Sequence, residues 1–169
     1  MSQADQKKKL DITISIDVYD NPSELSPEYA KLLKAAEQIT HQAYAPYSKF
    51  LVGAAILLDD GTIVTGSNQE NAAYPSGICA ERTAIYYTGA QYPNHKIKAI
   101  AVAAQRGDEV FLPAAPCGAC RQAMLEYEDK QSEDIQLILQ GQEDKIYVLS
   151  SIADLLPLKF GKKNLNTSK

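Results

Sequence analysis

Apolar residues recur with the period of a helix early in this chain. Between Ser26 and Pro46 they stand three or four positions apart and so fall on one helical face: Leu32, Ala36, Ile39 and Ala43. Ser26 followed by Pro27 favours a helix start, because the serine hydroxyl can accept a hydrogen bond from a free backbone N–H and proline needs none. The pattern predicts a helix that begins at Pro27 and ends before Pro46.

Short apolar runs, separated by further helices, follow this first helix. The runs are typical of buried strands and cover residues 52–58, 62–67, 97–104, 135–139 and 146–149. Asp59-Asp60-Gly61 joins the first two and favours a hairpin turn. Helices are predicted over residues 79–90 and 117–128, with a short one from Ser151. A hairpin followed by strands that alternate with helices predicts an α/β fold with a mixed sheet.

Residues 1–25 are predicted to form an N-terminal extension, and residues 26–169 a single domain. Between Leu10 and Val18 apolar residues alternate strictly with polar ones, which is the period of a half-buried strand. Asn21-Pro22 ends the alternation. The pattern predicts one added edge strand or a contact between subunits, and it carries no chemistry of its own.

Composition narrows the class of protein. The length of 169 residues agrees with one domain, and 45% hydrophobic and 22% charged residues exclude a disordered chain, a collagen and a coiled coil. A net charge of −4 and a pI near 5.2 argue against a nucleic-acid partner. No apolar run reaches the roughly 18 residues that a membrane span needs, and the start of the chain lacks the apolar core of a secretory signal. We therefore expect a cytoplasmic protein with no membrane partner.

All three cysteines of the chain stand where a helix is predicted to begin. Cys79 opens one helix, and Cys117 and Cys120 open another, 38 residues further on (117 − 79). Two such helix starts, packed side by side on a sheet, would bring three sulfur atoms together. Thiolates suit Zn²⁺, and three protein ligands leave the fourth tetrahedral position open for water. Glu81 stands two residues after the first ligand, where it can reach that water without binding the metal.

This pattern favours a catalytic zinc site over a structural one. A zinc knuckle or three small core residues would explain a lone C-x-x-C motif. The C-A-E motif together with P-C-G-A-C is instead the arrangement of zinc deaminases, in which a glutamate that is not a ligand moves protons. Three thiolates and Zn²⁺ sum to −1, so we expect the helix N-termini and Arg82 to offset the charge. Arg121 is either a second such donor or an ordinary surface charge.

Four motifs in order make the chain resemble the cytidine deaminase family. They are APYSKFLVGAA (45–55), TGSNQENAAY (65–74), ICAERTA (78–84) and PCGACRQ (116–122), and the resemblance extends from about residue 28 to residue 161. It implies a three-layer α/β/α fold with a mixed five-stranded sheet, and one Zn²⁺ per subunit held by Cys79, Cys117 and Cys120. A short chain with cysteine as its first ligand resembles the homotetrameric branch of the family, with active sites near subunit interfaces.

The resemblance also implies roles for residues that bind substrate. Phe50 packs against the pyrimidine, although on sequence alone a phenylalanine beside a strand belongs to the core. Asn68 and Glu70 bind the ribose 3′-hydroxyl. The backbone N–H of Ala80 contacts the carbonyl of the base.

Two aromatic residues are implied to act between subunits. Tyr74 resembles a residue that is contributed across a subunit interface. Phe160, in the stretch PLKFG, resembles a C-terminal aromatic that reaches a neighbour's site. The extension of residues 1–25 has no counterpart in the resemblance.

The implied reaction is hydrolytic deamination of cytidine and 2′-deoxycytidine to uridine and 2′-deoxyuridine, with release of ammonia, in pyrimidine salvage. Glu81 is expected to accept a proton from the zinc-activated water and to deliver protons to N3 and then to the amino group. One alternative is a deaminase for nucleoside antibiotics of the blasticidin type, which shares the zinc motif but has no need of the ribose-binding pair. The other is a zinc-binding protein without turnover. A deaminase acting on nucleic acid needs a basic channel, which this acidic chain does not favour.

Overall fold

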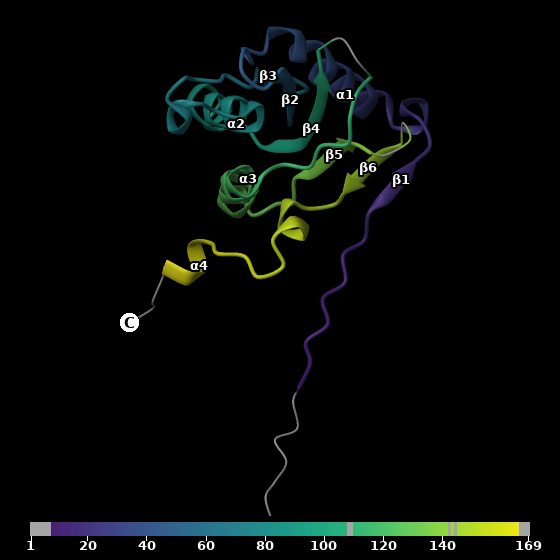
Figure 1. Ribbon diagram of the computed structural model, residues 1–169. Coiled ribbons are helices and arrows are strands. Elements are labelled where there is room, and N and C mark those ends of the chain that lie inside the picture. The colour runs from purple at the N-terminus through teal and green to yellow at the C-terminus, as the bar shows by residue number, and fades with distance from the viewer. Residues whose placement is uncertain (1–7, 108–109, 142, 144, 166–169) are drawn as a thin grey trace, which may run out of the picture.

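A mixed β-sheet lies at the centre of the fold (Figure 1). The computed structural model describes residues 8–107, 110–141, 143 and 145–165. The strands are β1 (Asp17–Tyr19), β2 (Phe50–Leu58), β3 (Ile63–Ser67), β4 (Ile97–Arg106), β5 (Gln136–Gln140) and β6 (Ile146–Leu149). They lie in the order β1-β6-β5-β4-β2-β3; β4 and β5 run parallel and the other neighbours antiparallel. The predicted α/β class and mixed sheet are confirmed.

The sheet has six strands rather than the five that the resemblance implied. The sixth is β1, which comes from the N-terminal extension and pairs antiparallel with β6 through three residue pairs. Of the strand predicted from Leu10 to Val18, the structure shows Asp17 and Val18 in β1, while residues 8–16 pair with no described strand. The reason is that β6 ends at Leu149 and offers no partner backbone beyond it. Residues 1–7 of the predicted extension and residues 166–169 of the predicted domain lie outside the described residues.

Helices cover both faces of the sheet and make the fold three-layered (Figure 1). On one face, Leu32 and Leu33 of α1 (Pro27–Ile39) pack against the strands. On the other, Ile85 of α2 (Ala80–Gln91) joins Met124 and Leu125 of α3 (Gly118–Gln131) in a second core. The shorter helical segments are the 3₁₀ turns Pro22–Glu24, Thr40–Gln42, Tyr74–Ser76 and Ile152–Leu155, and α4 (Lys162–Leu165).

The predicted start of α1 is present, and the helix ends earlier than its apolar stripe. The hydroxyl of Ser26 accepts a hydrogen bond from the backbone N–H of Tyr29, and Pro27 is the first helical residue. The α-helix ends at Ile39, where a 3₁₀ turn takes over. That turn returns the chain towards β2 before Pro46 is reached.

Close contact between β3 and α2 seats the first turns of α2 on the sheet. A Cβ atom added at Gly66 of β3 would lie 2.6 Å from the backbone nitrogen of Ala84 and 3.0 Å from the carbonyl oxygen of Ala80. Only a residue without a side chain permits this approach. Gly66 therefore determines how near α2 lies to the strand that precedes it.

A buried carboxylate on α3 anchors the chain that follows β6. Glu128 accepts hydrogen bonds from the backbone N–H groups of Ile135, Ile152 and Ala153, at 2.8 to 3.1 Å. It also accepts one from the hydroxyl of Ser151 at 2.8 Å. These bonds join α3 to the start of β5 and to the 3₁₀ turn after β6, so that buried N–H groups there do not lack partners.

Substitution of Gly66 tests the contact between β3 and α2. We expect Gly66→Ala to lower the free energy of unfolding by about 1–3 kcal/mol, because the new Cβ collides with backbone that cannot move independently. Urea unfolding of the zinc-loaded protein measures the change. Gly118→Ala is the matched control, since a Cβ there meets no atom within 4 Å. Equal free energies of unfolding for Gly66→Ala and Gly118→Ala would contradict the close contact between β3 and α2.

Candidate active site

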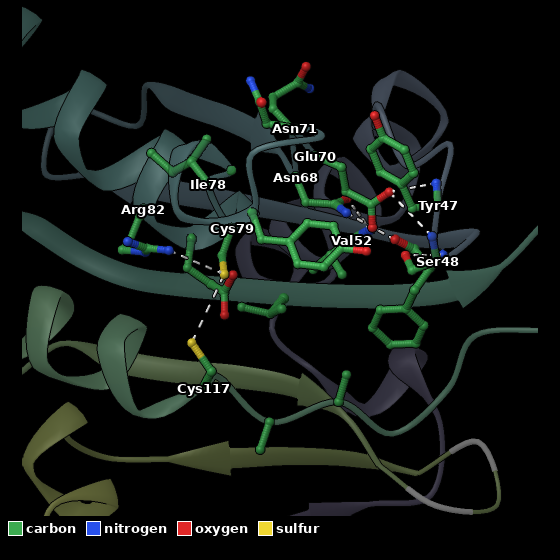
Figure 2. Close-up of a pocket in the computed structure, with 18 residues that line it drawn as sticks. Tyr47, Ser48, Val52, Asn68, Glu70, Asn71, Ile78, Cys79, Arg82 and Cys117 are labelled. Atoms are coloured by element: carbon green, nitrogen blue, oxygen red, sulfur yellow. Dashed lines mark hydrogen bonds between the residues drawn. The ribbon is translucent and has the colours of Figure 1, made fainter.

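Three cysteine sulfur atoms converge between the first turns of α2 and α3. Figure 2 shows two of them, those of Cys79 and Cys117. Cys79 immediately precedes α2, Cys117 immediately precedes α3, and Cys120 lies in the first turn of α3. The Sγ atom of Cys117 lies 4.0 Å from that of Cys79 and 3.5 Å from that of Cys120. The structure thus brings together the three residues that the sequence singled out as metal ligands.

This geometry suits a tetrahedral zinc ion. Zinc–sulfur bonds of about 2.3 Å at tetrahedral angles separate two sulfur atoms by about 3.8 Å. The distances of 3.5 and 4.0 Å bracket that value. Thiolate donors favour zinc over the oxygen-seeking magnesium and calcium ions. Three cysteines supply three of the four tetrahedral positions, which leaves one for a reacting molecule.

Hydrogen bonds within the cluster stabilise the thiolate of Cys79. The thiol of Cys120 is the largest influence, and together with the Arg82 guanidinium it lowers the pKa of Cys79 to about 5. The same interaction raises the pKa of Cys120. The Nη2 atom of Arg82 lies 3.7 Å from the Cys79 sulfur and points towards it (Figure 2). The cluster is therefore arranged to carry negative charge even before a cation is added.

Arg121 has a different role from either of those that the sequence left open. Its Nε atom donates to the carbonyl oxygen of Pro116 at 2.8 Å, and its Nη1 atom donates to that of Leu155 at 3.2 Å. Neither bond is to a sulfur atom. Arg121 thus braces the loop before Cys117 against the 3₁₀ turn that follows β6.

Glu81 lies in the first turn of α2, beside the sulfur cluster. Its side chain is buried, with 5% of its surface exposed. Burial raises the pKa of Glu81, and the negative charge of Cys79 raises it further. A raised pKa suits a carboxyl group that must accept a proton and pass it to a neighbour.

A cavity of about 690 Å³ opens in front of Cys79, Cys117 and Glu81. Its apolar wall consists of Phe50, Val52, Ile78, Val102, Ala114 and Ala115. Its polar wall includes Ser48, Asn68, Gln69, Glu70 and Asn71. A cavity of this size, apolar with a few polar groups, is typical of a site for a small organic molecule.

The side chain of Asn68 is held at the rim of this cavity by the backbone of β2. Its Oδ1 atom accepts from the N–H of Val52 at 2.8 Å, and its Nδ2 atom donates to the carbonyl of Phe50 at 3.0 Å. An amide nitrogen has two hydrogens, so one N–H remains for a ligand.

Glu70 lies next to Asn68 at the same rim (Figure 2). Its Oε2 atom accepts from the backbone N–H groups of Tyr47 at 2.9 Å and Ser48 at 3.3 Å. Hydrogen bonds from the Ser48 side chain and the Tyr47 backbone lower the pKa of Glu70. The side chain is thus an oriented carboxylate with acceptor capacity left for a hydroxyl group.

The similarity of this chain to known proteins shows its family. A family model described as "Cytidine and deoxycytidylate deaminase zinc-binding region" matches residues 26–132. The chain belongs to the cytidine deaminase family. A curated cytidine deaminase of Sporosarcina psychrophila is 40% identical over 136 residues, which cover 80% of this chain and 93% of that protein. The cytidine deaminase of Halalkalibacterium halodurans is 39% identical over 135 residues, covering 80% and 96%.

Solved structures of cytidine deaminases share this fold. The crystal structure of cytidine deaminase from Burkholderia pseudomallei matches with a TM-score of 0.65 at 40% sequence identity. The match covers 77% of this chain and 97% of that one. These matches show that the chain is an enzyme of the cytidine deaminase family with a zinc-binding region.

Among the described residues, no helix has both the length and the apolar character that a membrane span requires.

Three further residues singled out by the resemblance lie at different distances from the cavity. Ala80 is fully buried as the first residue of α2. Tyr74 lines the cavity, is 78% exposed, and meets Tyr47 edge-on with 6.3 Å between ring centres. Phe160 is 56% exposed and is not among the residues that line this cavity. Gln122 of α3 holds the Phe160 backbone by donating to its carbonyl oxygen at 2.9 Å.

The cavity also includes residues to which the sequence gave no role. Tyr47 and Ser48 stand in the same motif as Phe50, and Ala114 and Ala115 directly precede Pro116, so the motifs could have pointed to them. Val102 carries no such signal. It reaches the cavity because β4 pairs with β2, and only the register of the sheet shows this.

Removal of the Arg82 guanidinium tests its support of the thiolates. We expect Arg82→Gln to weaken zinc binding about 10- to 100-fold, the cost of losing a group that hydrogen-bonds a metal ligand. Competition with a chromogenic chelator measures the affinity. Arg106→Gln, at the exposed end of β4, is the matched control. The same zinc affinity in both variants would show that Arg82 does not support the site.

Proposed function

We propose that this enzyme deaminates cytidine and 2′-deoxycytidine hydrolytically to uridine and 2′-deoxyuridine, with release of ammonia. One observation carries the proposal: a buried glutamate lies beside three clustered thiols at the wall of a cavity large enough for a nucleoside. The relatives named cytidine deaminase support the substrate class. The catalytic unit is the domain of residues 26–169.

Cys79, Cys117 and Cys120 hold one zinc ion per subunit in this proposal. The bound ion supplies Lewis acidity that makes a water molecule acidic enough to lose a proton near neutral pH. The N–H groups at the starts of α2 and α3 and the Arg82 guanidinium offset the thiolate charge. These groups are needed because three thiolates outweigh the charge of the ion.

Glu81 acts as the proton carrier. Its carboxylate would accept one proton from the water molecule and deliver it to N3 while the remaining hydroxide oxygen bonds to C4 of the base. It would then take the proton of the new C4 hydroxyl and deliver it to the amino group. Ammonia leaves as the bond between C4 and nitrogen breaks. Burial favours the protonated form of Glu81, which suits a group that must hold a proton between two transfers.

The polar and apolar walls of the cavity bind the two halves of the nucleoside. Phe50 packs against the pyrimidine, and the backbone N–H of Ala80 at the start of α2 donates to the base carbonyl. Asn68 donates its remaining N–H to the ribose 3′-hydroxyl, and Glu70 accepts from the same hydroxyl. Both side chains are already oriented by the backbone of residues 47–52, so little conformational entropy is lost when substrate binds.

We further propose a homotetramer with active sites near its subunit interfaces. The exposure of Tyr74 and Phe160 supports this arrangement, because large aromatic side chains at interfaces are typically buried by a partner. Tyr74 and Phe160 contribute to neighbouring sites. The free thiols suit the reducing cytoplasm, where the reaction serves pyrimidine salvage.

Glu81→Gln tests the proton carrier. The variant is expected to keep its fold and zinc while losing at least 10²- to 10⁴-fold in turnover, because an amide cannot accept or deliver the proton. Ammonia release from cytidine, 2′-deoxycytidine, free cytosine and blasticidin S measures activity, and Glu133→Gln on the protein surface serves as control. Normal turnover in zinc-loaded Glu81→Gln would eliminate the proposed role. Turnover of blasticidin S alone by the wild-type enzyme would replace the substrate assignment.

The ribose contact of Glu70 is tested with a substrate that lacks the hydroxyl. Wild-type enzyme should prefer cytidine over 3′-deoxycytidine by about 10- to 100-fold in kcat/KM, the loss of a charged hydrogen bond. Glu70→Gln should reduce activity on cytidine while changing activity on 3′-deoxycytidine much less. Equal losses on both nucleosides would show that Glu70 acts only on the loop of Tyr47 and Ser48.

A further inference from the structure

Residues 8–16 form an extended arm that leaves the body of the protein and continues into β1 (Figure 1). From Leu10 to Val18 every second residue is apolar, and each of these side chains is 40 to 80% exposed: Leu10, Ile12, Ile14, Ile16 and Val18. In an extended chain alternate side chains point to the same side, so the arm has one apolar face and one polar face. A continuous apolar row of this kind is typical of a surface that meets a partner.

The arm continues from an edge of the sheet that has room for another strand. β1 is the outermost strand, and β6 pairs with one of its two edges. The other edge of β1 faces no described strand, and neither do residues 8–16. Unpaired backbone along an apolar extended segment favours the addition of a second strand.

We propose that two copies of this chain pair through their arms, which form an antiparallel two-stranded ribbon about a two-fold axis at Thr13. In this arrangement Lys9 of each copy lies opposite Asp17 of the other, and Asp11 lies opposite Ser15. The polar face therefore carries two ion pairs and a pair of facing threonines. Within the described residues, neither Lys9 nor Asp17 has an ion-pair partner in its own chain.

The apolar face of the ribbon is continuous in the same register. Leu10 lies opposite Ile16, and Ile12 lies opposite Ile14, so branched side chains pack across the strands. A shift by one residue would place the apolar face of one arm against the polar face of the other. If the two-fold axis lay at Ile14 instead, Asp11 of one copy would lie opposite Asp17 of the other, and their carboxylates would repel each other. Only the axis at Thr13 places Lys9 opposite Asp17, and this match of opposite charges favours a second copy of the same chain as the partner.

The ribbon separates the two bodies along its length. Asp17 of one copy is opposite Lys9 of the other, so the two Asp17 residues are separated by about eight strand residues, or roughly 27 Å. The end of each arm, near Lys9, adds to the open edge of the β1 strand of the other copy. The sheets of both copies are then joined through the ribbon, independently of the zinc site.

Cysteine cross-linking tests the register directly. In the full-length zinc-loaded protein, Thr13→Cys should give a disulfide-linked dimer on treatment with diamide, because facing residues in a ribbon have Cβ atoms about 4.5–5.5 Å apart. Ser15→Cys is the matched control, since its two copies would be about 13 Å apart along the ribbon. The wild-type chain shows the background from the zinc-site cysteines. Absence of the Thr13→Cys dimer, or equal cross-linking at both positions, would overturn the proposal.

Charge reversal tests the identity of the partner. With Thr13→Cys as reporter, we expect Lys9→Asp and Asp17→Lys each to reduce cross-linking several-fold. The double variant, which restores opposite charges across the ribbon, should recover it. A double variant that cross-links no better than the single variants would exclude the pairing of Lys9 with Asp17. Zinc content and deamination should be unchanged in all of them, because the arm lies outside the catalytic cavity.

Discussion

The proximity of three cysteine sulfur atoms is the constraint on which the rest of the structure depends. Sulfur atoms 3.5 to 4.0 Å apart cannot all be thiolates unless positive charge is close by. The chain supplies it with two helix N-termini and the Arg82 guanidinium. This solution requires α2 and α3 to lie side by side with their first turns level, and so it determines which strands they pack on. Gly66 of β3 permits the close approach of α2.

The sheet then determines what faces the sulfur cluster. Phe50 at the start of β2 pairs with Arg106 at the end of β4, and Gly53 pairs with Ser67 at the end of β3. The start of β2 and the ends of β3 and β4 therefore lie side by side at the same end of the sheet. The loops that leave this end of the sheet carry Asn68 and Glu70 to the cavity. The antiparallel centre thus brings distant motifs together, and the connection of residues 68–79 between β3 and α2 completes the cavity wall.

The elements of this fold are predictable from the sequence where a local interaction defines them. Ser26 and Pro27 begin a helix through their own chemistry, and each cysteine motif marks a helix start. Features that depend on tertiary contacts were not predictable. Residues 10–16 have the alternation of a strand, but β6 is too short to pair with them. Likewise, no local signal shows that Arg121 would bind the carbonyl of Leu155, since that contact exists only after the chain returns from β6.

Helix α3 contributes to the metal site and also binds the C-terminal part of the chain. Its first turn carries Cys120 and follows Cys117, while its later turns hold the C-terminal part of the chain through Glu128 and Gln122. Arg121 lies between them and bonds to both the cysteine loop and the 3₁₀ turn after β6. A displacement of the C-terminal segment would therefore act on the loop that precedes Cys117. The geometry of the metal ligands is coupled through one helix to a surface segment that carries the exposed Phe160.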